Sequence, residues 1–284
     1  MNDLGNKVAF VTGTARKKGI GRGLALRLAR DGADLAVNDI VKSPEELDPW
    51  DREAGWRGLD SLVAEIRSLG RQAIALTGDV TNSQEVNAMV ARVVKEFGKI
   101  DILVNNAALL TRDLGMRRIV EIDEETWKRG IDVNLTSLFL MSKAVARQMI
   151  KQEQGGKIIN IASRQGKAST IGMATYCASK AGVISLTQTL ALELGEYKIN
   201  VNAVCPGPIV SWSTFGKPAY EAMQQGMSED EAVAKAYANA ALGPLKRLGK
   251  VEDVANVVAF LASSQSDYMT GQAVNISGGL VFMR

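Results

Sequence analysis

The chain has 284 residues, of which 46% are hydrophobic and 23% are charged, and its formal net charge at pH 7 is +3. This length admits one large α/β unit or two smaller domains, and the near balance of charge gives no reason to expect nucleic acid or an anionic membrane as a partner. No histidine is present. This absence excludes Ser-His-Asp and Cys-His hydrolases and His-ligated zinc sites, so proton transfer falls to other side chains.

Cysteine use and hydropathy bear on the compartment. The sequence has no apolar run of membrane-spanning length and no segment typical of a signal peptide. Cys177 and Cys205 have no partner at the spacing of a metal site, so we interpret both as buried thiols and expect no metal site. We therefore expect a soluble, cytoplasmic protein without a membrane partner.

Seven short apolar segments are predicted to be strands, and helical stretches separate most of them. The segments are 8–11, 35–38, 73–76, 102–104, 158–161, 201–204 and 273–276. This alternation is typical of a parallel, doubly wound sheet with helices on both faces. Because no linker or internal repeat divides the chain, we expect residues 1–284 to form a single Rossmann-type α/β domain.

The first predicted strand runs into a glycine-rich loop with Gly13, Gly19, Ile20 and Gly21, and a helical pattern follows. Strand, loop and helix in this order form a phosphate-binding cradle. Glycines let the backbone approach a pyrophosphate, and the helix N-terminus supplies free N–H groups. Asp39 ends the next predicted strand, eighteen residues after Gly21, where a carboxylate is placed to bind a ribose diol.

Three further segments follow predicted strands, at the edge where open α/β sheets bind their ligands. They contain Asp79, Val80, Asn106, Ala107, Ala108, Pro206, Gly207 and Ile209. We expect these segments to contact a ligand bound at this edge of the sheet. Tight strand-to-helix turns are the purely structural alternative.

Tyr176 and Lys180 are four residues apart in a helical pattern, so both lie on one face of the helix. A phenol has a pKa of about 10, and a base that works near neutral pH needs this value lowered by roughly two to three units. A neighbouring ammonium favours the phenolate. Ser163, thirteen residues before Tyr176, adds a hydroxyl, and together the three groups could move a proton to or from an alcohol.

These motifs, in this order, resemble those of the short-chain dehydrogenase/reductase family over nearly the whole chain. The matching residues are Thr12-Gly13, Gly19-Ile20-Gly21, Asp79-Val80, Asn105-Asn106-Ala107, Asn134, Ser163, Tyr176, Lys180, Pro206-Gly207 and Gly278-Gly279. The chain departs from the family pattern twice. Five residues separate Gly13 from Gly19 where the family usually has three, and Ala108 stands in place of a glycine.

The resemblance implies an NAD(P)-dependent oxidoreductase that transfers a hydride between the nicotinamide and a secondary alcohol or ketone. Tyr176 would exchange the substrate proton, and Ser163 would hold the substrate oxygen. Lys180 would lower the pKa of the phenol and bind the nicotinamide ribose, while Asn134 would hold a water in a proton relay. The segment at 79–80 would border the adenine of the cofactor, and the segment at 206–209 would wall the nicotinamide. The family also implies a homotetramer, with a dimer as the alternative, in which helices around 134–152 and 176–193 and the apolar residues 279–283 pack between subunits.

Two features oppose each other in the choice of cofactor. Asp39 favours NAD, because its carboxylate would repel the 2′-phosphate of NADP. Arg16, Lys17 and Lys18 favour NADP, since a basic residue just before the second glycine often meets that phosphate in the family, and we count Lys18 among the cofactor contacts. We expect NAD, with NADP less favoured, because the strand end fixes Asp39 whereas a lengthened loop can carry its basic residues into solvent.

The substrate is predicted only by class. Residues 208–248 correspond to the family's variable substrate loop, whose large side chains either cover a pocket or pack helices; they are Trp212, Phe215, Tyr220, Met223 and Met227. A long insert at 41–58 has the length of a functional lid. Arg112, Arg164 and Gln165 suit a polar or anionic substrate, or are solvated surface residues. The run 176–188 resembles polyol and sugar dehydrogenases, which favours a polyhydroxylated small molecule or a hydroxy acid.

Three other functions stay open. An enoyl-thioester reductase is suggested by the lengthened glycine loop, although such enzymes usually space Tyr and Lys more widely. A non-catalytic nicotinamide-binding protein would bind cofactor without turning over an alcohol or ketone. A dehydrogenase that retains its nicotinamide and passes electrons to another carrier is suggested by the insert after Asp39.

Overall fold

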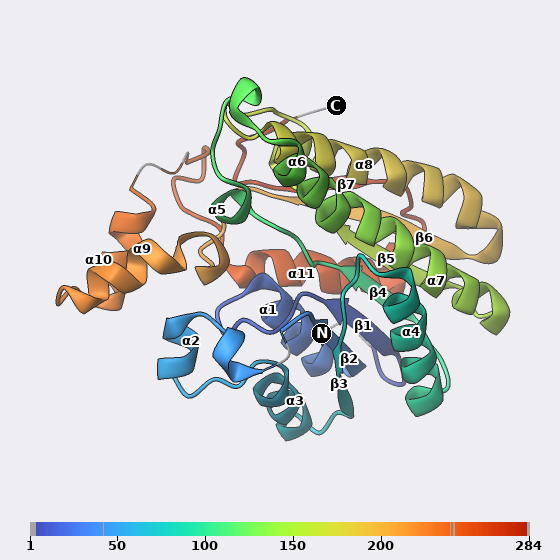
Figure 1. Ribbon diagram of the computed structural model, residues 1–284. Coiled ribbons are helices and arrows are strands. Elements are labelled where there is room, and N and C mark those ends of the chain that lie inside the picture. The colour runs from blue at the N-terminus through green and yellow to red at the C-terminus, as the bar shows by residue number, and fades with distance from the viewer. Residues whose placement is uncertain (1–3, 42, 239, 241, 283–284) are drawn as a thin grey trace.

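The strands of the computed structural model form one sheet (Figure 1). The structure describes residues 4–41, 43–238, 240 and 242–282, with side chains for all of these except 111–112 and 212–215. The strands are β1 (Val8–Thr12), β2 (Asp34–Asp39), β3 (Ala73–Thr77), β4 (Ile102–Asn105), β5 (Gly156–Ile161), β6 (Ile199–Pro206) and β7 (Ala273–Ile276). All pairings are parallel, in the order β3-β2-β1-β4-β5-β6-β7. The predicted parallel, doubly wound sheet is confirmed, and each predicted strand lies within an observed one.

Helices cover both faces of this sheet (Figure 1). The α-helices are α1 (Ile20–Arg30), α2 (Pro49–Glu53), α3 (Leu59–Ser68), α4 (Ser83–Phe97), α5 (Thr111–Leu114), α6 (Glu124–Ile131), α7 (Ser137–Gln152), α8 (Ala174–Leu194), α9 (Trp212–Gln224), α10 (Glu229–Ala236) and α11 (Val251–Ala262). Short 3-10 turns are η1 (Pro44–Glu46), η2 (Ile119–Glu121), η4 (Arg164–Gly166), η5 (Gly195–Tyr197) and η6 (Ser264–Ser266), and η3 (Asp132–Thr136) is a π-helical turn.

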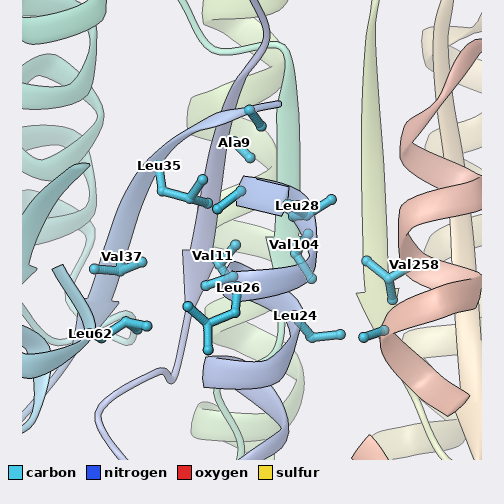
Figure 2. Close-up of a cluster of buried hydrophobic side chains, with 14 of the residues drawn as sticks. Ala9, Val11, Leu24, Leu26, Leu28, Leu35, Val37, Leu62, Val104 and Val258 are labelled. Atoms are coloured by element: carbon cyan, nitrogen blue, oxygen red, sulfur yellow. The ribbon is translucent and has the colours of Figure 1, made fainter. Parts of the chain in front are cut away.

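The side chains of β1 pack into two separate hydrophobic cores, because successive side chains of a strand point to opposite faces of the sheet. Ala9 and Val11 pack with α1, α3 and α11, and Figure 2 shows part of this cluster. Val8 and Phe10 pack on the other face with α4, α7 and the end of α8. All five residues of β1 are buried. A strand buried on both faces reads as a continuous apolar run, which is why the sequence pattern finds it.

The strand order places a topological switch beside β1. The chain leaves β3 at one edge of the sheet and returns to form β4 on the other side of β1. At such a point the connections after β1 and β4 diverge to opposite faces and leave a crevice at the carboxyl ends of the strands. The expected ligand-binding edge is therefore the edge that carries the glycine loop.

Neither of the two long connections is structureless. Residues 41–58 contain η1 and α2, each of which has a proline at the start of the helix, where the missing N–H costs nothing. Residues 208–248 contain α9 and α10, and α10 begins with a capping box between Ser228 and Glu231. Both segments project from the same side of the molecule (Figure 1). Among the described residues, no helix combines the length and the hydrophobicity that crossing a membrane requires.

Candidate active site

The glycine loop is tied to the end of β4. The side chain of Asn106 donates hydrogen bonds to the carbonyl oxygens of Thr12 and Gly13 at 2.9 and 2.8 Å. Gly13 has φ +71°, and a Cβ there would lie 2.7 Å from the Cα of Ala107, while a Cβ on Gly21 would lie 2.1 Å from the carbonyl oxygen of Gly13. Only glycine fits both positions, and the backbone is left uncovered where α1 begins. A helix N-terminus with bare backbone can bind a phosphate.

Asp39 is held by backbone donors. One carboxylate oxygen accepts the N–H of Ala15 at 2.8 Å, and the other accepts the N–H of Ile40 at 2.8 Å. The carboxylate is half-buried at the end of β2. Its position is thus fixed both by the sheet and by the glycine loop.

Tyr176 and Lys180 lie one turn apart on α8, as the sequence predicts. The ammonium of Lys180 is 5.8 Å from the centre of the Tyr176 ring and donates to the carbonyl oxygen of Ile161 at 2.8 Å. Lys180 is buried, and burial lowers the pKa of its ammonium to about 8. A lysine of this kind can hold or release a proton within reach of physiological pH.

The pKa of Tyr176 differs from the sequence-based expectation. Burial raises the pKa of this phenol above its ordinary value, and a hydrogen bond with Ser163 opposes the rise. Desolvation of the phenolate is the largest cause of the shift, and the ammonium of Lys180 is not among the groups that lower this pKa. In this state the Tyr176 hydroxyl therefore keeps its proton, and a phenolate would require further positive charge beside the ring.

Ser163 is buried at the carboxyl end of β5 and has a second polar neighbour. Its hydroxyl donates to the side-chain oxygen of Gln165 at 2.5 Å. The backbone N–H of Gln165 donates back to the same hydroxyl at 3.2 Å. The Ser163 hydroxyl therefore contacts both Gln165 and Tyr176.

Asn134 lies in the π-helical turn η3, a feature that recurs at functional sites. Its side chain accepts the N–H of Leu109 at 2.7 Å and donates to the carbonyl oxygen of Leu109 at 3.0 Å. It also donates to the hydroxyl of Ser179, at 3.4 Å, on the helix that carries Tyr176. The amide therefore joins the segment after β4 to α8, and its role in a proton relay stays a prediction.

A cleft of about 1290 Å³ opens at the predicted edge of the sheet. Sixteen of the predicted site residues line it: Gly13, Gly19, Ile20, Gly21, Asp39, Asp79, Val80, Asn106, Ala107, Ala108, Ser163, Tyr176, Lys180, Pro206, Gly207 and Ile209. Asp79 and Val80 lie just after the end of β3 rather than on it, and the Asp79 carboxylate accepts the hydroxyl and backbone N–H of Thr81. The cleft thus brings the glycine loop, Asp39 and the Tyr-Lys-Ser group together.

Two predicted site residues are placed differently. Asn134 and Lys18 are not among the described residues that line the cleft. The ammonium of Lys18 instead forms an ion pair with Glu229 at the start of α10. Contact between Lys18 and a cofactor remains a prediction.

The large side chains of the substrate segment pack among helices where they are described. Met223 and Met227 contact the buried alanines of α9 and α10. The Tyr220 ring meets the Trp50 ring at 5.7 Å between centroids, and its hydroxyl donates to Glu53. The side chains of Trp212, Phe215 and Arg112 lie outside the described residues. For Tyr220, Met223 and Met227, the packing interpretation therefore describes the structure better than a pocket cover.

The match to known proteins extends over this whole architecture. Residues 13–281 match a family model described as enoyl-(acyl carrier protein) reductase. A short-chain dehydrogenase/reductase of Armillaria gallica is 38% identical over 278 residues, which cover 97% of this chain and 96% of the relative. The chain belongs to the short-chain dehydrogenase/reductase family.

Individual short-chain dehydrogenases and reductases with this degree of similarity act on different substrates. A 3-oxoacyl-(acyl-carrier-protein) reductase of Staphylococcus epidermidis is 39% identical over 97% of this chain and 99% of the relative. Galactitol 2-dehydrogenase of Agrobacterium fabrum is 38% identical over 97% and 98%. A crystal structure of carveol dehydrogenase from Mycobacterium avium in complex with NAD superposes with a TM-score of 0.83 at 28% identity, covering 98% of this chain and 99% of that one.

Contact between the insert at 41–58 and this family site was not expected from the sequence. Trp56, expected to belong to a lid, is buried, and its indole donates to the carbonyl oxygen of Ala15. Asp48 forms an ion pair with Arg16, which lines the cleft. The sequence did hold a signal for this contact: the insert carries aromatic and acidic residues, and the lengthened loop that it contacts is basic. In the part of the chain that the structure describes, no group of three or more Cys, Asp or Glu side chains is arranged to hold a metal ion.

Proposed function

We propose that this protein is an NAD-dependent oxidoreductase that interconverts a secondary alcohol and its ketone. The observation that carries the proposal is the meeting of Tyr176, Lys180 and Ser163 with the glycine loop in one cleft. Both cysteines are free and buried, as expected, so neither takes part in a disulfide that would indicate an oxidising compartment. We accordingly propose a cytoplasmic enzyme.

The residues present fit a nicotinamide dinucleotide. Bare backbone at the start of α1 would bind the pyrophosphate, Asp39 the adenosine ribose and Lys180 the nicotinamide ribose. When bound, this cofactor accepts or donates the hydride. The structural relative from Mycobacterium avium holds NAD, which supports the choice of NAD over NADP.

Proton transfer is assigned to Tyr176. In reduction, its phenol would protonate the nascent alkoxide; its raised pKa suits a donor. In oxidation, the phenol must first lose a proton, and the ammonium of Lys180 together with the positive charge of an oxidised nicotinamide would favour the phenolate. Ser163 would donate a hydrogen bond to the substrate oxygen and stabilise charge as it develops.

The substrate would be a polar small molecule. The cleft is lined by both basic and acidic side chains, so hydroxyl groups would find partners beyond the reacting carbon. These side chains include Lys128, Arg129, Arg164, Gln165, Asp113, Glu124, Glu125 and Asp132. A polyol, a sugar or a hydroxy acid meets this requirement, and the galactitol dehydrogenase relative supports it. A 3-oxoacyl thioester is the second candidate, since the Staphylococcus epidermidis relative reduces that class. The four-residue spacing of Tyr176 and Lys180 argues against enoyl reduction.

A substrate panel tests this proposal. Polyols, 2- and 3-hydroxy acids, acetoacetyl thioester and crotonyl thioester are assayed with both cofactors by nicotinamide absorbance. We expect turnover of an alcohol or ketone with NAD or NADH. Turnover of crotonyl thioester alone would establish the enoyl reductase instead, and cofactor binding without any turnover would favour the non-catalytic alternative. Cofactor that stays bound through gel filtration would favour the retained-nicotinamide alternative.

We further propose a homotetramer. Large apolar side chains are exposed on the two helices that the family packs between subunits, with Phe139 on α7 at 43% and Leu192 on α8 at 86%. Phe282, near the C-terminus, is 79% exposed, and Met283 lies outside the described residues. Apolar groups this exposed are typical of an interface.

A further inference from the structure

Two of the three basic residues of the glycine loop have acidic partners. Arg16 pairs with Asp48 of the insert, and Lys18 pairs with Glu229. Of these two basic side chains, only Arg16 is among the described residues that line the cleft, together with Asp39. Of the two, Arg16 would thus stand nearer to a 2′-phosphate on the adenosine ribose.

The insert is built to hold this loop. Asp48 is the residue before the first turn of α2, and Asp51 in that helix is only 2% exposed. A hydrogen bond from the backbone of Lys17 reaches Asp51, and burial raises the pKa of this carboxyl against the opposing effect of the neighbouring cations. The side chains of Arg16 and Asp48 are 35% and 20% exposed, so this ion pair is partly shielded from water. The Coulomb attraction within such a pair is screened less by solvent and salt than the attraction within a pair on an open surface.

We infer that Asp48 is a specificity-determining residue that makes the enzyme select NAD. Its carboxylate compensates the charge of Arg16, so that Arg16 would not offset the repulsion between Asp39 and a 2′-phosphate. Loss of Asp48 would release the guanidinium, whose planar donors suit a phosphate. The inference rests on the proposed binding of a nicotinamide dinucleotide in this cleft. Residues 41–58 would then act on cofactor choice rather than as a lid.

The test uses nucleotides that carry only the adenosine half of each cofactor. Calorimetry measures binding of 5′-AMP and of adenosine 2′,5′-bisphosphate to the full-length wild type and to Asp48→Asn and Asp48→Ser. Asn and Ser both keep a residue that favours a helix N-cap, so α2 should persist. We expect each variant to bind the bisphosphate about tenfold more tightly, the gain of one charge-assisted contact, with 5′-AMP affinity changed less than about twofold.

Two further variants locate the effect. The double variant Arg16→Gln with Asp48→Asn should lose the gain, because the guanidinium that causes it is gone. Glu229→Gln is the matched control: it removes the partner of Lys18, and we expect both affinities to stay unchanged. A gain in bisphosphate affinity with Glu229→Gln would overturn the inference in favour of Lys18.

Three further outcomes would test the inference about Asp48. If the Asp48 variants bind 5′-AMP normally and show no gain for the bisphosphate, the inference is wrong. If the Asp48 variants do not fold, Arg16→Gln alone still tests the inference. Because Asp48 already compensates Arg16 in the wild type, removing the guanidinium should change bisphosphate affinity by less than about twofold. A larger loss of affinity would refute the inference. If the wild type binds neither nucleotide, the proposed cofactor site fails and the inference fails with it.

Discussion

The indole N–H of Trp56 donates a hydrogen bond of 2.6 Å to the carbonyl oxygen of Ala15. The guanidinium of Arg22 lies 5.3 Å from the centre of the Trp56 ring and donates to the carbonyl oxygen of Lys17 at 3.0 Å. The insert at 41–58 and the lengthened glycine loop are therefore one structural unit. The lengthened glycine loop and the insert thus depend on each other for their positions.

Trp56→Phe tests this unit. The variant removes the N–H and leaves the buried carbonyl of Ala15 without its donor, which costs about 1–3 kcal/mol. Since Ala15 also donates to Asp39, we expect KM for NAD to rise roughly three- to tenfold while kcat stays within about twofold. Steady-state kinetics and thermal unfolding provide the check, with the half-exposed Trp127→Phe as control. If KM for NAD stayed unchanged while Tm fell, Trp56 would have only a structural role.

Tyr176→Phe should abolish turnover while NAD binding stays nearly intact. The phenylalanine ring keeps its packing on α8 and loses only the group that moves the proton. Turnover on the best substrate of the panel and NADH affinity by fluorescence are measured side by side. Retention of more than about a tenth of the wild-type kcat would remove Tyr176 from the proton-transfer role.

Lys180→Met should change how stability depends on pH. The pKa of Lys180 is about 8 in the folded protein, against an ordinary value of 10.5. Between these two pH values the unfolded chain holds a proton that the folded chain has released, so the wild type gains stability as pH rises. Relative to the Met variant, its free energy of unfolding should increase by roughly 3 kcal/mol between pH 8 and pH 10.5.

Urea unfolding of both proteins without cofactor, at several pH values across this window, checks the difference. Groups that Lys180 does not contact cancel in the comparison. A difference that stays flat with pH would mean that the ammonium keeps its ordinary pKa. Separately, the Met variant should lose both turnover and NAD affinity.

Asp39→Ala should erode the preference for NAD. The carboxylate would bind the ribose diol of NAD and repel the phosphate of NADP, so its loss weakens one complex and relieves the other. For the wild type we expect kcat/KM to favour NAD by roughly 30- to 150-fold, or about 2 to 3 kcal/mol. Equal wild-type values for the two cofactors would show that Asp39 does not govern the choice.

Leu192→Glu should dissociate the proposed tetramer. This side chain is 86% exposed on α8, and a carboxylate buried between two helices would lack a partner. Light scattering at micromolar concentration should report a tetramer for the wild type and a smaller species for the variant. Glu193→Gln, at the neighbouring position, is the control and should leave the mass unchanged. A monomeric wild type would contradict the assembly directly.

The sequence by itself determined the sheet and most of the candidate site. Strands such as β1 are buried on both faces, so each appears as an unbroken apolar run. The site residues follow strand ends or share a helical face, as Tyr176 and Lys180 do, and these relationships are local. Local spacing survives folding unchanged, because a strand or a helix fixes where its own side chains point.

Only the tertiary structure decided which distant groups meet. Lys18 forms an ion pair with Glu229, and the indole of Trp56 donates a hydrogen bond to the carbonyl oxygen of Ala15. The side chain of Asn134 accepts a hydrogen bond from the backbone of Leu109 rather than from a neighbour on its own turn. Burial likewise raises the pKa of Tyr176. The spacing between Tyr176 and Lys180 alone had predicted a lower pKa. Such partners and such desolvation depend on how whole elements pack, and no short window of sequence specifies that packing.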